Sequence, residues 1–252
     1  MKLLTLNIWG GQVYDPLIEF IKSKRNEIDI FCFQEVLNGI KGEKSEVIVN
    51  APNAVIDIYS QIKDILLEYN GYFVRTQYEE GLAIFIRKNI SVTKNGDIFV
   101  YRYRDSMENK DVETIGRSIQ YVEFKINNNQ FAIVNFHGLW VNRGGKDDTP
   151  ERIKQSRRIK KFLDNTNGTK ILCGDFNLWP KTQSMAILEK EMKNLVKDYN
   201  IASTRSSLYS RFFDKNDRFA DYILVSKDVK VLDFKVLPNE VSDHLPLFLE
   251  FN

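Results

Sequence analysis

The sequence is poor in the residues that dominate disulfide-rich, zinc-binding and membrane-spanning chains. Its 252 residues include only two cysteines, Cys32 and Cys173, and only two histidines. Two cysteines inside apolar runs give neither a disulfide framework nor a zinc-ligand spacing. No stretch approaches the roughly 18 uninterrupted apolar residues of a transmembrane helix, and the start lacks the apolar core of a secretory signal. These absences predict a cytoplasmic protein without a membrane span.

The sequence also lacks an excess of one charge. Its 36 basic and 34 acidic residues leave a formal net charge of +2, so any basic surface for nucleic acid must be local. Neither a linker rich in Pro, Ser and Gly nor a low-complexity segment divides the chain. The length is sufficient for one large α/β core. We therefore expect residues 1–252 to form a single domain.

Apolar runs and turn residues outline an alternation of strands and helices. Alternating or continuous apolar runs predict strands, whereas apolar residues at helical spacing predict helices. The predicted strands are 2–8, 29–36, 73–78, 82–88, 98–103, 118–126, 130–137, 170–177, 219–226, 229–236 and 245–251. The predicted helices are 15–25, 54–69, 149–163 and 182–193. Because strand pairs alternate with helices, mixed sheets are favoured over one parallel sheet.

Polar side chains stand where several of these strands end. Asp175 and Asn177 follow an apolar run, and side-chain alternation points both to the same side of the strand. Glu35, His137 and His244 occupy similar edges. A solvent-exposed turn is the alternative, since Asp and Asn both favour turns. A buried strand end with these groups instead needs a cation, a water or a substrate to meet them.

The motifs at these edges resemble those of the endonuclease/exonuclease/phosphatase superfamily. In chain order they are L-N-I-W-G, F-Q-E-V, G-R-S, N-F-H-G, G-D-F-N, F-A-D-Y-I and S-D-H, and they extend from Asn7 to His244. One such motif is weak, but the ordered set is specific. The resemblance implies a four-layered α/β sandwich, with two mixed β-sheets packed face to face and helices on the outside. It also implies a phosphoric ester hydrolase whose cleft lies where the strand ends converge.

The resemblance further implies a divalent cation, Mg²⁺ or Mn²⁺. Hydrolysis of a phosphoester uses a hard cation, a positioned water and a proton for the leaving oxygen, and oxygen ligands suit these two ions. We expect Glu35 to be the principal metal ligand, with Asn7 beside it and Asp243 as a second carboxylate. Trp9 stands where some relatives carry another Asp, and we expect it at the substrate rim.

Catalytic roles follow from the same resemblance. His244 is expected to act as the general base or to contact the phosphate, oriented by Asp221. Asp175 is expected to orient or deprotonate the attacking water, and Asn177 to donate to a phosphate oxygen. His137 places the chain nearer the deoxyribonucleases, sphingomyelinases and tyrosyl-DNA phosphodiesterases than the exonuclease III-type enzymes.

Three further residues complete the predicted site. Glu80 is expected to support His137, although the adjacent Glu79 is an alternative. Arg117 resembles a phosphate-contacting arginine, for which a surface ion pair is the alternative. Tyr78 is expected to stack on a sugar or a base.

The predicted substrate is a phosphodiester, and we expect it to be nucleic acid. The basic groups that could contact it are Lys41, Lys44, Arg102, Arg104, Arg143, Lys146, Arg152, Lys154, Arg157, Arg158, Lys160 and Lys161. The last six lie on the helix predicted at 149–163, where we interpret them as a solvated face. Alternatives are a lipid headgroup, as for a sphingomyelinase or an inositol phosphatase, a 5′-tyrosyl-DNA adduct, and a non-catalytic binding module. No partner protein is evident.

Overall fold

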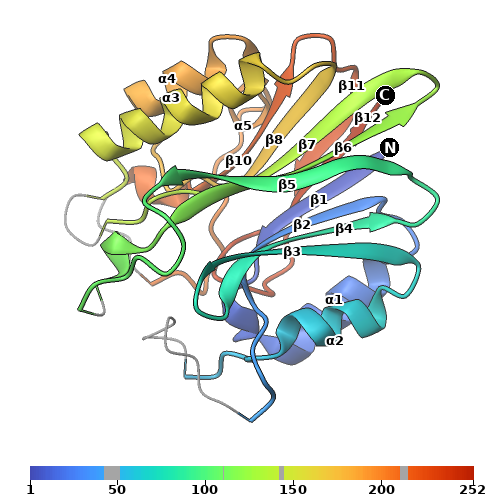
Figure 1. Ribbon diagram of the computed structural model, residues 1–252, viewed down its shortest axis with the longest axis vertical. Helices are drawn as coiled ribbons and strands as arrows, with labels where there is room; N and C mark the ends of the chain where they lie inside the picture. Colours follow the sequence, from blue (N-terminus) through green and yellow to red (C-terminus); the bar gives the residue numbers. More distant parts are fainter. Residues whose placement is uncertain (43–51, 110, 142–144, 211–214) are drawn as a thin grey trace.

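Two six-stranded sheets face each other across a shared core (Figure 1). The computed structural model describes residues 1–42, 52–109, 111–141, 145–210 and 215–252. The first sheet has the order β11-β12-β1-β2-β4-β3, where β1 is Lys2–Asn7, β2 Ile30–Leu37, β3 Tyr69–Gln77, β4 Glu80–Arg87, β11 Val231–Val236 and β12 Leu247–Phe251. The second has the order β5-β6-β7-β8-β10-β9, where β5 is Val92–Tyr101, β6 Arg117–Ile126, β7 Asn129–His137, β8 Thr169–Asp175, β9 Met192–Asn194 and β10 Asp221–Ser226.

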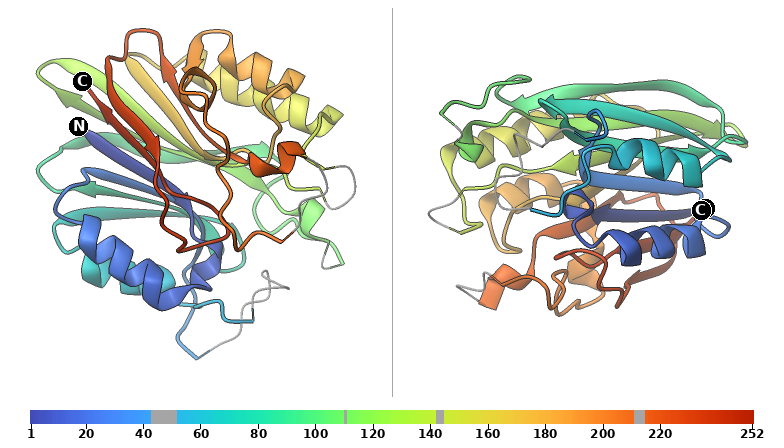
Figure 2. Two further views of the ribbon diagram at one scale, coloured as in Figure 1. Left: turned by 180° about the vertical axis from the view of Figure 1, so that it is seen from behind. Right: turned by 90° about the horizontal axis from the view of Figure 1, so that it is seen from below.

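Helices cover the outer faces of both sheets (Figures 1 and 2). The α-helices are α1 Tyr14–Lys24, α2 Ile58–Ile65, α3 Pro150–Asp164, α4 Gln183–Glu189 and α5 Leu195–Asp198, and the short 3₁₀ turns are Trp9–Gly11, Val112–Thr114 and Lys215–Arg218. α1 and α2 lie against the first sheet, and α3 and α4 against the second. These layers confirm the predicted α/β sandwich with mixed sheets.

Strand alternation divides the apolar residues between two cores. Cys32 of β2 and Cys173 of β8 belong to the core between the sheets. Phe31, the neighbour of Cys32, points the other way and packs in a second core that includes Leu17 of α1 and Ile62 of α2. Each of these residues is at most 1% exposed. Because β2 and β8 are buried on both faces, their sequences are continuous apolar runs instead of alternating ones.

A layer of buried amides joins the two sheets just below the strand ends. Gln34 Nε2 donates to Asn135 Oδ1 (2.6 Å), and Asn135 Nδ2 donates to the carbonyl oxygen of Phe33 (2.9 Å). Glu35 follows the first of these amides by one residue, and His137 follows the second by two. These hydrogen bonds fix how β2 and β7 are aligned along their length, and therefore how Glu35 and His137 lie relative to each other.

Two predicted helices are shorter than expected, because sheet pairing takes part of each segment. The predicted helix 54–69 forms only Ile58–Ile65, and Tyr69 begins β3 by pairing with Arg87. The predicted helix 182–193 ends at Glu189, after which β9 pairs with β10. Within the described ranges, no helix is both long and apolar enough to span a membrane.

Candidate active site

The polar strand ends meet at one end of the sandwich. β1 runs parallel to β2, and β7 runs parallel to β8, so the carboxyl ends of each pair lie at the same edge. β10 is antiparallel to β8 and begins there. The register places His137 beside Asp175 on one side and Asp221 beside it on the other. Asp175 therefore lies between His137 and Asp221 at this edge, and its catalytic role stays a prediction.

Asn7 holds two carboxylates together. Its Nδ2 donates to Glu35 Oε1 (2.9 Å) and to Asp175 Oδ2 (3.1 Å), whereas its Oδ1 accepts the backbone N–H of Trp9 (2.9 Å). The Trp9 hydrogen bond fixes the orientation of the amide, because a rotated amide would set two donors against each other. The structure thus gives Asn7 and Trp9 a positioning geometry, and their roles toward metal and substrate stay predictions.

Glu35 leaves the regular ladder of the first sheet. The pairing of β2 with β4 shifts between Phe33 and Val36, and Glu35 has a φ of 52°. This bulge turns the carboxylate toward the site. Burial, together with the nearby carboxylates of Glu80, Asp243 and Asp175, raises the pKa of Glu35 to about 8. A cation bound at Glu35 would relieve this repulsion.

The donor set fits a hard divalent cation. Glu35, His137 and Asp175 offer ligand atoms that all lie within 4.8 Å of one another. Arg117 Nη1 lies 3.1 Å from His137 Nδ1, and because a guanidinium only donates, this nitrogen accepts and the proton of the neutral ring is on Nε2. A protonated nitrogen does not bind metal, so the two carboxylates are the available ligands. Paired carboxylate oxygens suit Mg²⁺ or Mn²⁺.

His137 is surrounded by Arg117 and Glu80. Glu80 Oε1 lies 3.8 Å from His137 Nδ1 and 3.9 Å from Arg117 Nη1. Glu80 is buried, whereas Glu79 is only partly buried, so the structure brings Glu80 to the histidine. Burial and the charge of Arg117 hold the pKa of His137 well below its usual range, and burial raises the pKa of Glu80. His137 is therefore neutral at pH 7.

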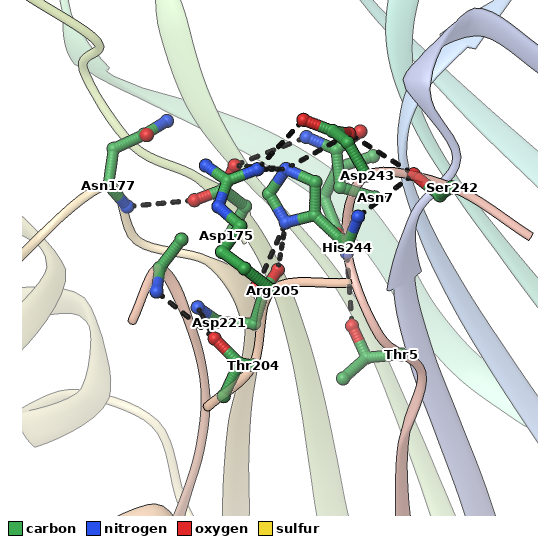
Figure 3. Close-up of polar contacts among 12 residues, drawn as sticks. Thr5, Asn7, Asp175, Asn177, Thr204, Arg205, Asp221, Ser242, Asp243 and His244 are labelled. Carbon is green, nitrogen blue, oxygen red and sulfur yellow. Dashed lines mark hydrogen bonds and ion pairs between the residues drawn. The ribbon is translucent and has the colours of Figure 1, made fainter. Parts of the chain in front are cut away.

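His244 has the opposite arrangement (Figure 3). Its Nδ1 lies 2.8 Å from both carboxylate oxygens of Asp221, which can only accept, so Nδ1 carries the proton. The Nε2 lone pair then lies 3.6 Å from Asp175 Oδ2 and 3.7 Å from Asp243 Oδ1. Burial and the charge of Arg205 lower the pKa of His244 to about 4. Burial raises the pKa of Asp221 to about 7.

Two buried cations in the site were missed or misread from the sequence. Arg205 donates through Nη1 to Asp243 Oδ2 (3.1 Å) and to His244 Nε2 (Figure 3). Lys146 was counted among surface basic groups, but it is only 3% exposed, and its Nζ donates to the carbonyl oxygens of Asp217 (3.2 Å) and Phe219 (2.9 Å). Burial lowers the pKa of Lys146 to about 7. No local pattern distinguishes these two from other basic residues in polar loops.

Asn177 and Tyr78 lie at the margins of the site. Asn177 follows the end of β8 with a φ of 50°, and its backbone N–H donates to Asp175 Oδ1 (2.9 Å). Its Nδ2 lies 3.4 Å from the Gly138 carbonyl oxygen, so in this state it does not point at Asp175. Tyr78 is 39% exposed on the turn between β3 and β4. Tyr78 is thus exposed to solvent, whereas Asn177 is 2% exposed, and the substrate contacts of both residues stay predictions.

The predicted basic surface is only partly described. Lys44 and Arg143 lie outside the described residues. On α3, Arg152 departs from the predicted solvated face, since it is 1% exposed and donates through Nη1 to the carbonyl oxygen of Asp147 (2.6 Å) and through Nε to that of Leu139 (3.2 Å). Its guanidinium therefore ties α3 to the preceding loop.

Comparison with known proteins identifies the family. A sequence model of the Endonuclease/Exonuclease/phosphatase family matches residues 4–244. The chain belongs to this family. A search of curated proteins finds no match. Members of the family hydrolyse phosphoric esters and generally use divalent metals, so the predicted superfamily and the general reaction class agree with this assignment.

Several solved structures share the fold over the whole chain. A mannosyl-6-phosphatase of Bacteroides thetaiotaomicron VPI-5482 has 17% sequence identity and a TM-score of 0.71, covering 100% of this chain and 99% of its own. A humanized TDP2 of D. rerio has 14% identity and a TM-score of 0.70, covering 100% and 98%. The human Nocturnin catalytic domain has 20% identity and a TM-score of 0.67, covering 100% and 94%. At these identities the similarity establishes the fold.

Proposed function

We propose that this chain is a divalent-metal-dependent hydrolase of phosphate esters. The observation that carries the proposal is the convergence on a single oxygen, Asp175 Oδ2. Asn7 Nδ2 lies 3.1 Å from it, His244 Nε2 3.6 Å and His137 Nε2 3.8 Å. These groups come from positions 7 to 244 of the sequence, so the fold assembles them from both sheets. A non-catalytic module of this fold has no need to keep two neutral histidines on one carboxylate.

The carboxylates of Glu35 and Asp175 would hold the ion, with Asp243 close enough to raise the pKa of Glu35. When bound, Mg²⁺ or Mn²⁺ supplies positive charge against the phosphate oxygens. Asn7 keeps the two ligand carboxylates at a fixed separation through its Nδ2 hydrogen bonds.

One histidine serves the attacking water and the other serves the leaving oxygen. His244 Nε2, which here accepts a hydrogen bond from Arg205 Nη1, takes a proton from the attacking water when that water replaces the Arg205 contact, while Asp221 stabilises the resulting imidazolium. The water oxygen forms a bond to phosphorus, and the bond from phosphorus to the leaving oxygen breaks. His137 Nε2–H donates a hydrogen bond to that leaving oxygen and stabilises its developing charge, and the oxygen takes its proton from solvent water. Arg117, whose Nη1 contacts His137, is placed to bind a phosphate oxygen.

The nucleic-acid substrate remains part of this proposal. Arg104 lies over the rings of Phe99 (5.6 Å) and Tyr103 (5.9 Å), and Tyr103 is 67% exposed. Asp105 accepts the backbone N–H of Tyr78 (2.7 Å), which ties this aromatic and basic surface to the turn before Glu80. Exposed aromatic rings beside arginines suit the bases and phosphates of a nucleic acid. A lipid headgroup or a tyrosyl-DNA adduct would use the same catalytic residues.

Hydrolysis of bis-p-nitrophenyl phosphate tests the proposal. We expect activity with Mg²⁺ or Mn²⁺, loss of that activity with a chelator, and losses of about 100-fold or more in Glu35→Gln and His244→Ala. Glu19→Gln, an exposed site on α1, is the matched control and should keep the parental rate. Metal-independent rates, or full rates in both site variants, would refute the proposal.

A substrate panel then separates the candidates for the natural ester. The panel contains single-stranded, duplex, abasic and 5′-tyrosyl DNA, RNA, sphingomyelin and phosphoinositides. We expect the nucleic acids to be hydrolysed faster than the lipids, because the exposed rings and arginines adjoin the turn that precedes Glu80. Faster hydrolysis of sphingomyelin or phosphoinositides, together with flotation on liposomes, would favour the lipid alternative.

A further inference from the structure

Arg205 is a buried cation at the centre of the site. It is 7% exposed, and its Nη1 donates to Asp243 and to His244 as described above. Its Nε is buried and has no hydrogen-bond partner among the described residues. An unpaired buried N–H is costly, so this donor points to a group that completes it.

The surroundings of Arg205 keep its charge and its orientation. Burial alone would lower its pKa, but the carboxylates of Asp243, Asp175 and Asp221 outweigh burial and raise the pKa above its ordinary value. Its guanidinium carbon lies 4.2 Å from the ring centroid of Tyr209, and Lys146 Nζ lies 5.3 Å from the same centroid. Stacking on the ring limits the rotation of the guanidinium. Arg205 is therefore a fixed positive charge and not a mobile surface side chain.

Arg205 and Arg117 form two similar pairs that converge on Asp175. Each donates through Nη1 to a histidine, and each of those histidines places Nε2 within 3.8 Å of Asp175 Oδ2. In both arginines Nε is buried without a partner among the described residues. The Nε and Nη groups of arginine bind two oxygens of a phosphate at once. Because the Nε group of each arginine lacks a partner among the described residues, the two arginines together could bind an anion with several oxygens.

We infer that Arg205 is a specificity-determining residue that binds a non-bridging phosphate oxygen, so that the site prefers phosphomonoesters to phosphodiesters. A monoester presents three non-bridging oxygens and, above neutral pH, two negative charges. A diester presents two such oxygens and one charge. An ion held by the metal ligands, together with Arg117, would contact the two non-bridging oxygens of a diester. Arg205 would contact the additional oxygen of a monoester and balance its additional charge. The substrate class is therefore a terminal phosphate, whether on a nucleotide, an oligonucleotide end or a sugar.

This inference rests on the proposed hydrolytic function and narrows it. It is tested with p-nitrophenyl phosphate and methyl p-nitrophenyl phosphate, which share a leaving group and differ in charge. With saturating Mn²⁺ above neutral pH, the parental protein should prefer the monoester. In Arg205→Met, we expect kcat/KM to fall about 100-fold for the monoester and less than about 10-fold for the diester, as for loss of one charge-assisted contact. Arg205→Lys, which retains the charge but not the paired donors, should recover part of the preference.

Internal controls separate specificity from folding. A partly unfolded variant loses both activities equally, so the ratio of the two rates is insensitive to the folded fraction. Arg218→Met removes an exposed arginine whose backbone carbonyl accepts the N–H of Thr204, and it should leave both rates unchanged. Equal losses for the two esters in Arg205→Met, or a parental preference for the diester, would overturn the inference.

Binding of inorganic phosphate distinguishes failure of the inference from failure of the proposed function. If the parental protein hydrolyses neither ester, the hydrolytic proposal fails, and calorimetry with inorganic phosphate in the presence of Mn²⁺ still examines Arg205. We expect Arg205→Met to weaken phosphate binding by about 10-fold or more. Unchanged phosphate affinity in that variant would refute a phosphate-binding role.

Discussion

The two sides of the site are built from the same residue types and reach opposite proton states. On one side Arg117 donates to Nδ1 of His137, which leaves the proton on Nε2. On the other side Asp221 accepts from Nδ1 of His244, which leaves a lone pair on Nε2. Both Nε2 atoms lie near the same oxygen of Asp175. One neutral imidazole can thus donate a hydrogen bond while the other takes a proton.

The difference teaches that the partner of Nδ1, and not the histidine itself, decides whether Nε2 donates or accepts. Asp221 lies at the start of β10, directly opposite Asp175 in the sheet register, and both its oxygens reach His244 at 2.8 Å. Glu80 lies at the start of β4 and remains 3.8 Å from His137. The close carboxylate of Asp221 keeps the proton on Nδ1 of His244. The more distant carboxylate of Glu80 does not, so Nδ1 of His137 accepts a hydrogen bond from Arg117 instead.

The largest expected effect distinguishes the two histidines by how the rate of each variant depends on the leaving group. His244→Ala should lower kcat by about 10³-fold for aryl and alkyl esters alike, because both need a base for the water. His137→Ala should lower it about 10²- to 10³-fold for an alkyl ester but less than about 10-fold for a p-nitrophenyl ester, whose leaving oxygen spreads its charge into the ring and needs little stabilisation. The measurement is kcat for matched aryl and alkyl esters of the same phosphate.

Phe31→Leu, a conservative change in the core behind the first sheet, is the control for general loss of packing and should affect both esters equally. An equal loss for the two esters in His137→Ala would contradict the assigned contact of His137 with the leaving oxygen. So would a leaving-group dependence that appeared in His244→Ala instead.

The strand ends of the site could be predicted from the sequence, because the apolar run that forms each strand and the polar residue that ends it are neighbours in the chain. The apolar run before Asp175 and the edge at His137 each predict a buried strand that terminates in a polar group. Parallel and antiparallel pairing then brings these ends together. The choice between Glu79 and Glu80 could be narrowed in the same way, because alternation along a strand buries only one of two neighbouring side chains.

Arg205 and the proton positions could not be predicted in the same way. Arg205 contacts Asp243 and His244, which lie 38 and 39 residues further along the chain, and its loop has no apolar period to orient it. The tautomers of His137 and His244 depend on Arg117 and Asp221, again through contacts between separate strands. Similarly, Tyr69 left its predicted helix because pairing with Arg87 in the sheet outweighed local helical spacing.

A smaller effect should come from the carboxylates behind the two histidines. Asp221→Asn replaces an acceptor with an amide that can donate to Nδ1 and so move the proton of His244 to Nε2, for which we expect a loss of about 10²-fold in kcat. Glu80→Gln should cost about 10-fold or less, since its carboxylate lies 3.8 Å from His137 and makes no short hydrogen bond to it. The tautomers can be read from imidazole nitrogen spectra, because the chain has only two histidines. Equal losses, or an unchanged His244 spectrum in Asp221→Asn, would contradict this ranking.

The smallest expected effect concerns stability and compares Glu35 with Asp221. Asp221 has His244 as a hydrogen-bond donor, whereas the closest partner of Glu35 is the neutral amide of Asn7. Burial and neighbouring carboxylates raise the folded-state pKa of Glu35 to about 8, above its value of about 4.3 in an unfolded chain. Its contribution to stability is therefore full below the unfolded pKa and is lost as the pH rises through about 8.

Metal-free protein should consequently become less stable between pH 6 and pH 9, and Glu35→Gln should be more stable than the parental chain at pH 9 but not at pH 6. The expected difference in melting temperature is about 2–4 °C for each kcal/mol at this chain length. Mn²⁺ should raise the melting temperature of the parental protein and leave Glu35→Gln nearly unchanged. If Glu35→Gln were instead less stable at pH 9, the raised pKa of Glu35 would be contradicted. If the variant gained as much from Mn²⁺ as the parental protein, the ion would not bind at Glu35, and Asp175 and Asp221 beside His244 would be the alternative ligands.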